Sequence, residues 1–195
     1  MKFHYCGKYD LNPDNLPQRE HPEGSVQFKE PEDTQKLSAA ANGIAFAAAI
    51  VLLLPVCQIY GFDNIFGGLD AMIACILAII AMIPHELLHA LCFKKDVYMY
   101  ENLRQGLMFV VGTEDMSRGR FIFMSLLPCI VLGIVPYIAG FAAGSMALLL
   151  FGAVNAASAG GDFINVYNCL TQVPKGALVY MSGIRSYWYV PEHKA

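Results

Sequence analysis

The chain has 195 residues, of which 56% are hydrophobic and only 15% are charged. A soluble domain carries about 25% charged residues, whereas here the charges crowd into residues 1–36, residues 94–120 and the end of the chain. This composition excludes an ordinary soluble domain. The net charge of −3 offers no basic surface for nucleic acid, so we expect no nucleic-acid partner.

The N-terminal part of the chain divides into a polar tail and a first apolar segment. Residues 1–36 are rich in charges and proline and are typical of a tail or a small extended cap. Residues 37–60 carry no charge and are long enough for a helix to cross a bilayer. The first half of that segment is rich in alanine, which lets another helix approach closely. We expect the first transmembrane helix here.

A second apolar segment covers residues 71–93, and Glu86 is its only charged residue. It contains the sequence His85-Glu86-Leu87-Leu88-His89 directly after Pro84. Side chains four residues apart lie on one face of a helix, about one turn apart. We expect a second transmembrane helix with a kink at the proline and with both histidines on one face.

The polar segment 94–120 separates the second span from the next one. Residues 97–100 and 107–111 are β-branched and aromatic, and a short polar stretch lies between them. This pattern predicts a β-hairpin. The edge of such a hairpin could pair with an extended substrate, although a purely structural hairpin is the alternative.

Residues 121–174 are long enough to cross a membrane twice, turning between residues 136 and 144, and Asp162 is their only charged residue. In the fourth span, Asn155, Ser158, Asp162 and Asn165 recur at helical spacing, which predicts a polar stripe on one helix face. Asn155, Ser158 or Asn165 could orient a metal ligand or polarise a substrate carbonyl, or could only join helices by hydrogen bonds.

Lysine and arginine predict the orientation of the chain. They are absent from the loop after the first span and from the loop between the third and fourth spans, whereas residues 94–120 and both ends of the chain contain them. The positive-inside rule then places both termini in the cytoplasm. We therefore predict an all-α integral membrane protein, with four transmembrane helices in residues 37–174, a β-hairpin-like segment between the second and third, and a cytoplasmic or interfacial tail over 175–195.

The residues of the second and fourth spans indicate a metal site. His85 and His89 could hold one Zn²⁺ ion, and Glu86 could act as the general base that takes a proton from water. A charge inside a membrane span is costly and usually marks function. Asp162 lies at a similar predicted depth on another span and could complete a set of three ligands, which leaves one position for water.

These residues resemble a known family. The His-Glu-Leu-Leu-His span, the hairpin segment and a last span with an acidic residue are similar to the core of site-2 proteases, the intramembrane zinc metalloproteases. A closer resemblance is to small membrane proteins described as zincin peptidases, which pair the motif with a late Gly-Gly-Asp, here Gly160-Gly161-Asp162. The resemblance implies that His85, His89 and Asp162 bind zinc and that Glu86 is catalytic.

The sequence therefore predicts an intramembrane zinc metalloprotease. Its substrate would be a membrane-spanning or membrane-associated peptide that unwinds into an extended form in the lipid bilayer. The alternatives are a membrane protein that binds or transports metal, an inactive relative that only binds partners, and a purely structural subunit, which would leave Glu86 and Asp162 as costly buried charges without a purpose. A transporter would be expected to show internal repeats with broken helices, and no such repeat is visible.

Overall fold

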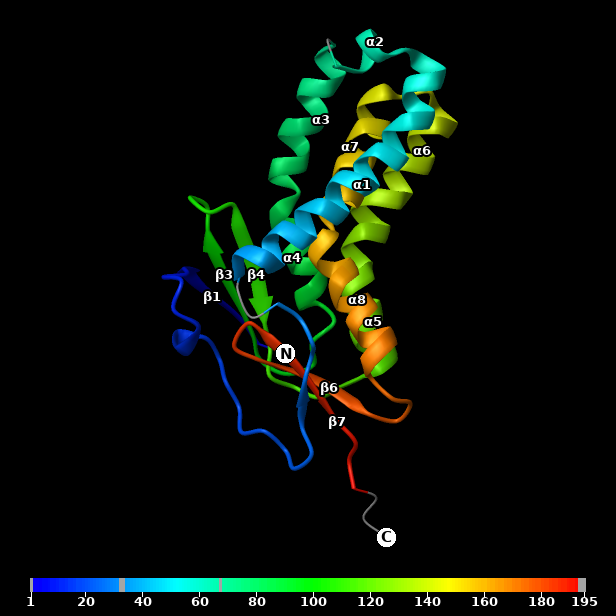
Figure 1. Ribbon diagram of the computed structural model, residues 1–195. Helices are drawn as coiled ribbons and strands as arrows, with labels where there is room; N and C mark the ends of the chain where they lie inside the picture. The colour runs from blue at the N-terminus through cyan, green and yellow to red at the C-terminus, as the bar shows by residue number, and fades with distance from the viewer. Residues whose placement is uncertain (1, 32–33, 67, 193–195) are drawn as a thin grey trace. The chain divides into compact units, whose positions relative to one another are not determined.

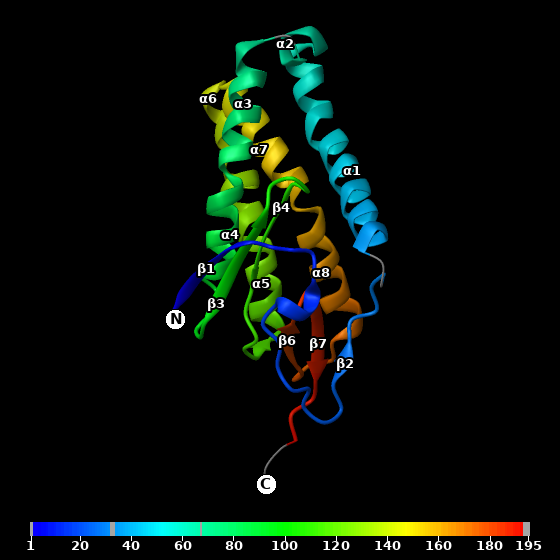
Figure 2. The same ribbon diagram turned by 90° about the vertical axis from the view of Figure 1, so that its left-hand side faces the viewer.

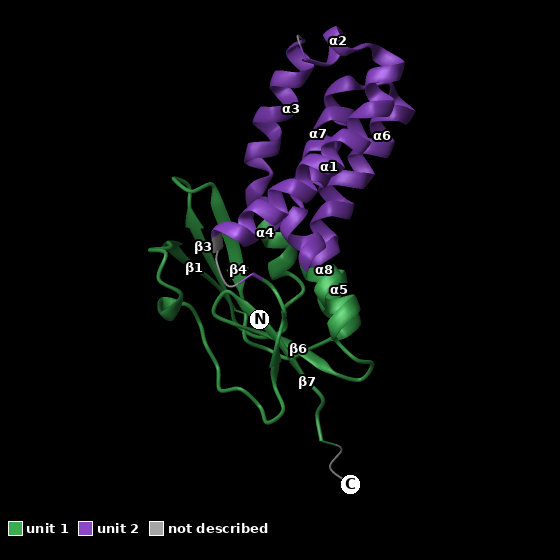
Figure 3. Cartoon of the chain, in the orientation of Figure 1, with its two compact units in different colours: residues 1–30, 86–124, 165–195 green, residues 31–85, 125–164 purple. Residues whose placement is uncertain are grey.

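The computed structural model describes residues 2–31, 34–66 and 68–192. The chain forms two compact units (Figure 3): unit 1 comprises Met1–Glu30, Glu86–Met124 and Asn165–Ala195, and unit 2 comprises Pro31–His85 and Ser125–Ile164. The tails predicted over 1–36 and 175–195 include residues 1, 32–33 and 193–195, which lie outside the described part of the chain.

Unit 2 is helical. Its elements are α1 (Thr34–Tyr60), α2 (Phe62–Phe66), α3 (Leu69–Ile80), the π-helical turn η2 (Cys129–Ile134), α6 (Val135–Ala143) and α7 (Met146–Ser158). Helix α7 packs against α1, α3 and α6, and both views show it between them (Figures 1 and 2). The close packing depends on glycine, because a Cβ atom at Gly152 would overlap the backbone of Tyr137 and one at Gly133 would overlap Ala156.

Three helices begin in one unit and end in the other: α4 (Met82–Ala90), α5 (Arg118–Pro128) and α8 (Gly160–Gln172). Within the described residues, the helical stretches Gln35–Tyr60, Leu69–Ala90 and Arg118–Ala143 are long and apolar enough to cross a membrane. The pair α7 and α8, bent by 49°, makes a fourth span if it is counted as one. These lengths and compositions indicate a membrane protein.

Unit 1 contains two β-sheets. The first has the strand order β1 (Phe3–Lys8), β3 (Val97–Asn102), β4 (Leu107–Val111), with β1 parallel to β3 and β3 antiparallel to β4. The second is antiparallel and has the order β2 (Val26–Gln27), β7 (Arg185–Tyr189), β6 (Leu178–Ser182), β5 (Met116–Ser117). A short 3₁₀ turn, η1 (Pro13–Asn15), lies between β1 and β2.

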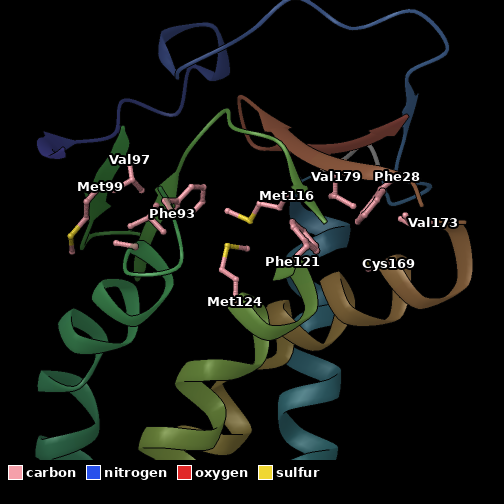
Figure 4. Close-up of a cluster of buried hydrophobic side chains, with 13 residues drawn as sticks. Phe28, Phe93, Val97, Met99, Met116, Phe121, Met124, Cys169, Val173 and Val179 are labelled. Atoms are coloured by element: carbon pink, nitrogen blue, oxygen red, sulfur yellow. The ribbon is translucent and has the colours of Figure 1, made fainter. Parts of the chain in front are cut away.

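The core of unit 1 gathers apolar side chains from the strands, from α5 and from the segment after α4 (Figure 4). Phe28 and Phe121 are almost fully buried in it, with ring centroids 5.9 Å apart in an edge-to-face arrangement. Burying one such ring contributes about 1.5–3 kcal/mol. Unit 1 is therefore held together by an ordinary hydrophobic core.

The fold prediction is correct in its apolar helices and its hairpin but wrong in describing the chain as all-α. It is also wrong in placing the turn between the third and fourth spans over residues 136–144, because α6 continues to Ala143 and α7 begins at Met146. The predicted hairpin is formed by β3 and β4, with Tyr98 opposite Val111. The N-terminal segment, predicted as a tail or cap, contributes β1 and β2, and the C-terminal segment forms the β6–β7 hairpin. Pairing between strands far apart in the sequence satisfies backbone groups that an isolated tail would leave to water.

Candidate metal centre

Helix α4 carries the His-Glu-Leu-Leu-His sequence. The preceding helix α3 ends at Ile80 with Ala81 as its C-cap, and α4 begins at Met82, so the break in this span lies three residues before Pro84. A proline is tolerated in the first turn of a helix because the N–H groups there have no partner within the helix. The backbone N–H of His85 then donates to the carbonyl of Ala81 at 2.9 Å, which continues the helix into the motif.

The motif residues form one compact group on α4. One ligand atom from each of His85, Glu86 and His89 lies within 4.8 Å of the others. Glu86 and His89 are buried, and His85 is half-buried. Imidazole nitrogens and carboxylate oxygens are the donors that zinc binds in proteins. The group could therefore hold a metal ion.

The ring of His89 is oriented by a backbone carbonyl. Its Nδ1 lies 2.9 Å from the carbonyl oxygen of Met124 on α5. A carbonyl only accepts hydrogen bonds, so the neutral ring must carry its proton on Nδ1 and the lone pair on Nε2. Metal-binding histidines usually have their second nitrogen held in this way. Sequence analysis missed this contact because Met124 contributes only its backbone.

Asp162 lies beside the first histidine of the motif. Its Oδ2 is 3.3 Å from Nε2 of His85, and both side chains are largely buried. Two ligands about 2.0–2.1 Å from one tetrahedral zinc ion are about 3.3–3.4 Å apart. The observed distance therefore fits two ligands of the same ion, although the ligand role of Asp162 stays a prediction.

The position of Asp162 follows from the start of α8. The stripe predicted along one helix is interrupted at Ala159, the C-cap of α7, where the chain bends before α8 begins with Gly160 and Gly161. Glycine is a poor helix former, which favours a break here. A Cβ atom at Gly160 would overlap the carbonyl oxygen of Ala41, so only glycine permits this approach of α8 to α1. Asp162 thus lies in the first turn of α8, where the helix dipole favours a negative charge.

The three weaker candidates are placed differently from the prediction of one continuous helix face. Asn155 and Ser158 lie on α7 and bond to carbonyls of that helix, those of Phe151 and Asn155 respectively, each at 2.8 Å. Asn155 is buried, whereas Ser158 is exposed. Asn165 lies on α8 and is half-buried. A role of these residues in orienting a ligand or a substrate stays a prediction.

Two residues that sequence analysis did not select hold the chain just after α4. The buried carboxylate of Glu114 accepts the backbone N–H groups of Lys94 and Lys95 and an N–H of Arg120. Arg120 also donates from Nε to the carbonyl of Cys92 at 2.9 Å. The only feature of the sequence that could have indicated this contact is the pair of opposite charges, six residues apart, just before the next span.

Comparison with known proteins gives one match. A family model described as "Putative zincin peptidase" matches residues 78–178. The matched segment contains the motif on α4, the β3–β4 hairpin and Asp162. No curated protein and no solved structure matches the chain.

Proposed function

The chain belongs to the zincin peptidase family, and we propose that it is an intramembrane zinc metalloprotease that hydrolyses a peptide bond in or next to a membrane-spanning substrate. The observation that carries the proposal is the 3.3 Å distance between Nε2 of His85 and Oδ2 of Asp162. This distance brings a carboxylate next to the first histidine of the motif, at the spacing of two ligands of one zinc ion. The matching family is already described as peptidases.

The proposed zinc ligands are His85, His89 and Asp162. His85 and His89 lie one turn apart on α4, and Asp162 approaches His85 from α8. Two neutral imidazoles and one carboxylate match the donor sets of catalytic zinc sites, which keep one position open. When bound, zinc would lower the pKa of a coordinated water to about 7 and polarise the substrate carbonyl.

Glu86 is the proposed general base. Its carboxylate is buried on α4 between the two histidines in sequence, so it lies next to the metal ligands without being needed as one. It would accept the proton of the attacking water and pass it to the leaving amine, which are the two proton transfers that peptide hydrolysis requires.

The proposed substrate is a peptide segment that becomes extended in or near the bilayer. A helix buries its carbonyls in its own hydrogen bonds, so a scissile bond must leave the helical conformation before water can attack. Strands β3 and β4 continue the chain after α4 and, with β1, form a sheet in unit 1. Main-chain pairing at an edge of this sheet would hold such a segment by strand addition.

The chain is proposed to cross the membrane four times with both termini in the cytoplasm, on the basis of its lysine and arginine distribution. Cys6 lies in the N-terminal segment and is exposed. In a variant that keeps only this cysteine, a membrane-impermeant thiol reagent should label inverted vesicles and leave intact cells unlabelled. The opposite labelling would reverse the orientation.

The test of the function uses the purified full chain in detergent with a model transmembrane peptide. We expect one zinc ion per chain and cleavage that stops when a chelator removes the metal. Glu86→Gln should keep the zinc and abolish cleavage, because the amide cannot accept the proton. Asp162→Asn should weaken zinc binding by more than the about 10–100-fold that loss of an outer hydrogen-bond partner costs, if the carboxylate is a ligand.

The outcomes separate the proposed function from its alternatives. Bound zinc without cleavage by the unmodified chain would favour a metal-binding or transport protein, or an inactive relative. Normal cleavage by Glu86→Gln would show that Glu86 is not the base. A chain that binds no metal would overturn the proposal entirely.

A further inference from the structure

Helix α5 contains a proline that removes one backbone hydrogen-bond donor from the helix. Pro128 is the last residue of α5 and lies four residues after Met124. In an α-helix, each carbonyl accepts the N–H of the residue four positions later. Proline has no N–H, so Pro128 cannot supply the bond that the Met124 carbonyl would otherwise receive. The chain then continues as the π-helical turn η2, a form often found at functional sites.

The same carbonyl is the one that holds His89. Nδ1 of His89 lies 2.9 Å from the Met124 oxygen, and both residues are buried. A buried carbonyl without a donor costs free energy, as does a buried ring N–H without an acceptor. The hydrogen bond gives the His89 ring an acceptor and the Met124 oxygen a donor.

We propose that Pro128 is a positioning residue for the metal site. By withholding an N–H from the Met124 carbonyl, it keeps this oxygen available to fix the proton of His89 on Nδ1 and to direct Nε2 toward a metal ion. The part that concerns zinc affinity rests on the proposed function, whereas the part that concerns the His89 proton does not.

The first test restores the missing donor. Pro128→Ala adds an N–H that can bond the Met124 carbonyl along the helix, which would turn this oxygen toward the helix axis and weaken its bond to His89. In the metal-free full chain labelled with ¹⁵N-histidine, the variant should shift the His89 proton from Nδ1 toward Nε2, which the ring ¹⁵N chemical shifts report. Assignment uses His→Gln variants. Zinc affinity should fall about 10–100-fold, the usual effect of losing a contact that orients a ligand.

The matched control is another proline inside a predicted membrane span. Pro55 lies within α1 and is exposed. Pro55→Ala also restores a backbone N–H, but in helix α1 and not in the helix whose Met124 carbonyl contacts His89. It should leave the His89 ¹⁵N shifts and the zinc affinity unchanged. If it alters them as much as Pro128→Ala does, the effect is a general result of straightening a helix, and the proposal is wrong.

A second variant separates the missing N–H from the shape of the proline ring. Lactic acid placed at position 128 by stop-codon suppression forms an ester, which has no N–H and no ring. It should keep the His89 proton on Nδ1 and bind zinc more tightly than Pro128→Ala. An ester variant that matches Pro128→Ala would overturn the proposal, because the ring and not the absent donor would then be responsible.

The results distinguish this inference from the proposed function. If the unmodified chain bound no zinc, the proposed function would fail, yet Pro128→Ala should still move the His89 proton. If Pro128→Ala left that proton on Nδ1, the inference would fail, while zinc binding and cleavage by the unmodified chain would stand.

Discussion

The two units of the protein satisfy their polar groups in different ways. In unit 1, charged side chains such as Glu114 and Arg120 are drawn into the fold and bond to the backbone and to each other. In unit 2, the helices present apolar side chains outward, Phe46 and Ile79 among them, and approach each other through glycine and alanine. Unit 1 follows the rules of a water-soluble domain, and unit 2 follows those of a membrane bundle.

This difference shows which interactions hold each half of the His-Glu-Leu-Leu-His motif in place. The division between the units falls between His85 and Glu86. His85 pairs with Asp162 inside the helical unit, whereas His89 is held by the Met124 carbonyl inside the unit that contains the sheets. One histidine of the motif is therefore held by a side chain of the helical unit, and the other by a backbone carbonyl of the unit that contains the sheets.

The largest effect is expected from breaking the polar network of unit 1. Glu114→Ala removes the acceptor of two backbone N–H groups and the partner of Arg120. Removing one member of a buried ion pair costs about 3–5 kcal/mol, because the remaining charge stays buried and unpaired. We expect a loss of that order in the free energy of unfolding, measured by chemical denaturation in detergent.

The matched control is Glu23→Ala, since Glu23 is an exposed glutamate of the same unit. It should change the free energy of unfolding by less than about 0.5 kcal/mol. Equal effects of the two substitutions would mean that the Glu114 contacts contribute no stability. Buried polar contacts would then not distinguish unit 1 from unit 2.

A smaller effect is expected from filling a glycine contact in unit 2. The three atoms nearest to a Cβ atom at Gly152 are backbone atoms of Tyr137 and Gly133, which cannot rotate away. Gly152→Ala should therefore destabilise the chain by about 1–3 kcal/mol, as overpacking does. At Gly43 in α1 a Cβ atom meets nothing within 4 Å. Gly43→Ala should instead stabilise by up to about 1 kcal/mol through helix propensity. Thermal unfolding of both variants measures the difference, and the same sign for both would contradict the packing argument.

The helices and the β3–β4 hairpin could be predicted from the sequence because their signals are local. Uncharged runs mark the membrane helices, and two β-branched and aromatic runs mark the hairpin. The remaining strands could not be identified in this way. Strand β1 pairs with β3, which is about ninety residues away in the sequence, and no local pattern encodes that partner. The β6–β7 hairpin does have a turn signal in Gly183, but residues 175–195 were predicted as a cytoplasmic or interfacial tail.

The candidate site was predictable where its residues are unusual for their surroundings. The motif spacing selects His85, Glu86 and His89, and Asp162 is the only charge in a long apolar stretch. The Met124 carbonyl is invisible to such reasoning, because every residue has one and only the fold decides which is used. The bend at Ala159 was missed, since an apolar helix with two glycines is equally compatible with a continuous span.

A weaker effect is expected from Glu30, whose ionisation should make the stability of unit 1 depend on pH. Burial raises the pKa of Glu30 above the ordinary value of 4.5, and the hydrogen bond and charge of Arg185 only partly offset this. In the interval between the ordinary and the raised pKa, the folded chain binds more protons than the unfolded chain. Stability should therefore fall as the pH rises through that interval. Glu30→Gln should lack this dependence, because the amide does not ionise. Thermal midpoints of both proteins between pH 4 and pH 7 test it, and parallel curves would contradict the expectation.

Moving the tryptophan to the outer face of unit 2 should change stability least. Its fluorescence in lipid tests most directly whether the two units differ in their contact with acyl chains. Trp188 on β7 is the only tryptophan of the chain. Phe46 lies on α1 and is 70% exposed, so Phe46→Trp in a Trp188→Phe background should fold normally and place the new ring against acyl chains. Brominated lipids in reconstituted vesicles should quench this tryptophan strongly and quench Trp188 of the unmodified chain weakly. Equal quenching of the two would mean that the exposed apolar face of unit 2 does not contact lipid, and its outward side chains would then need another explanation.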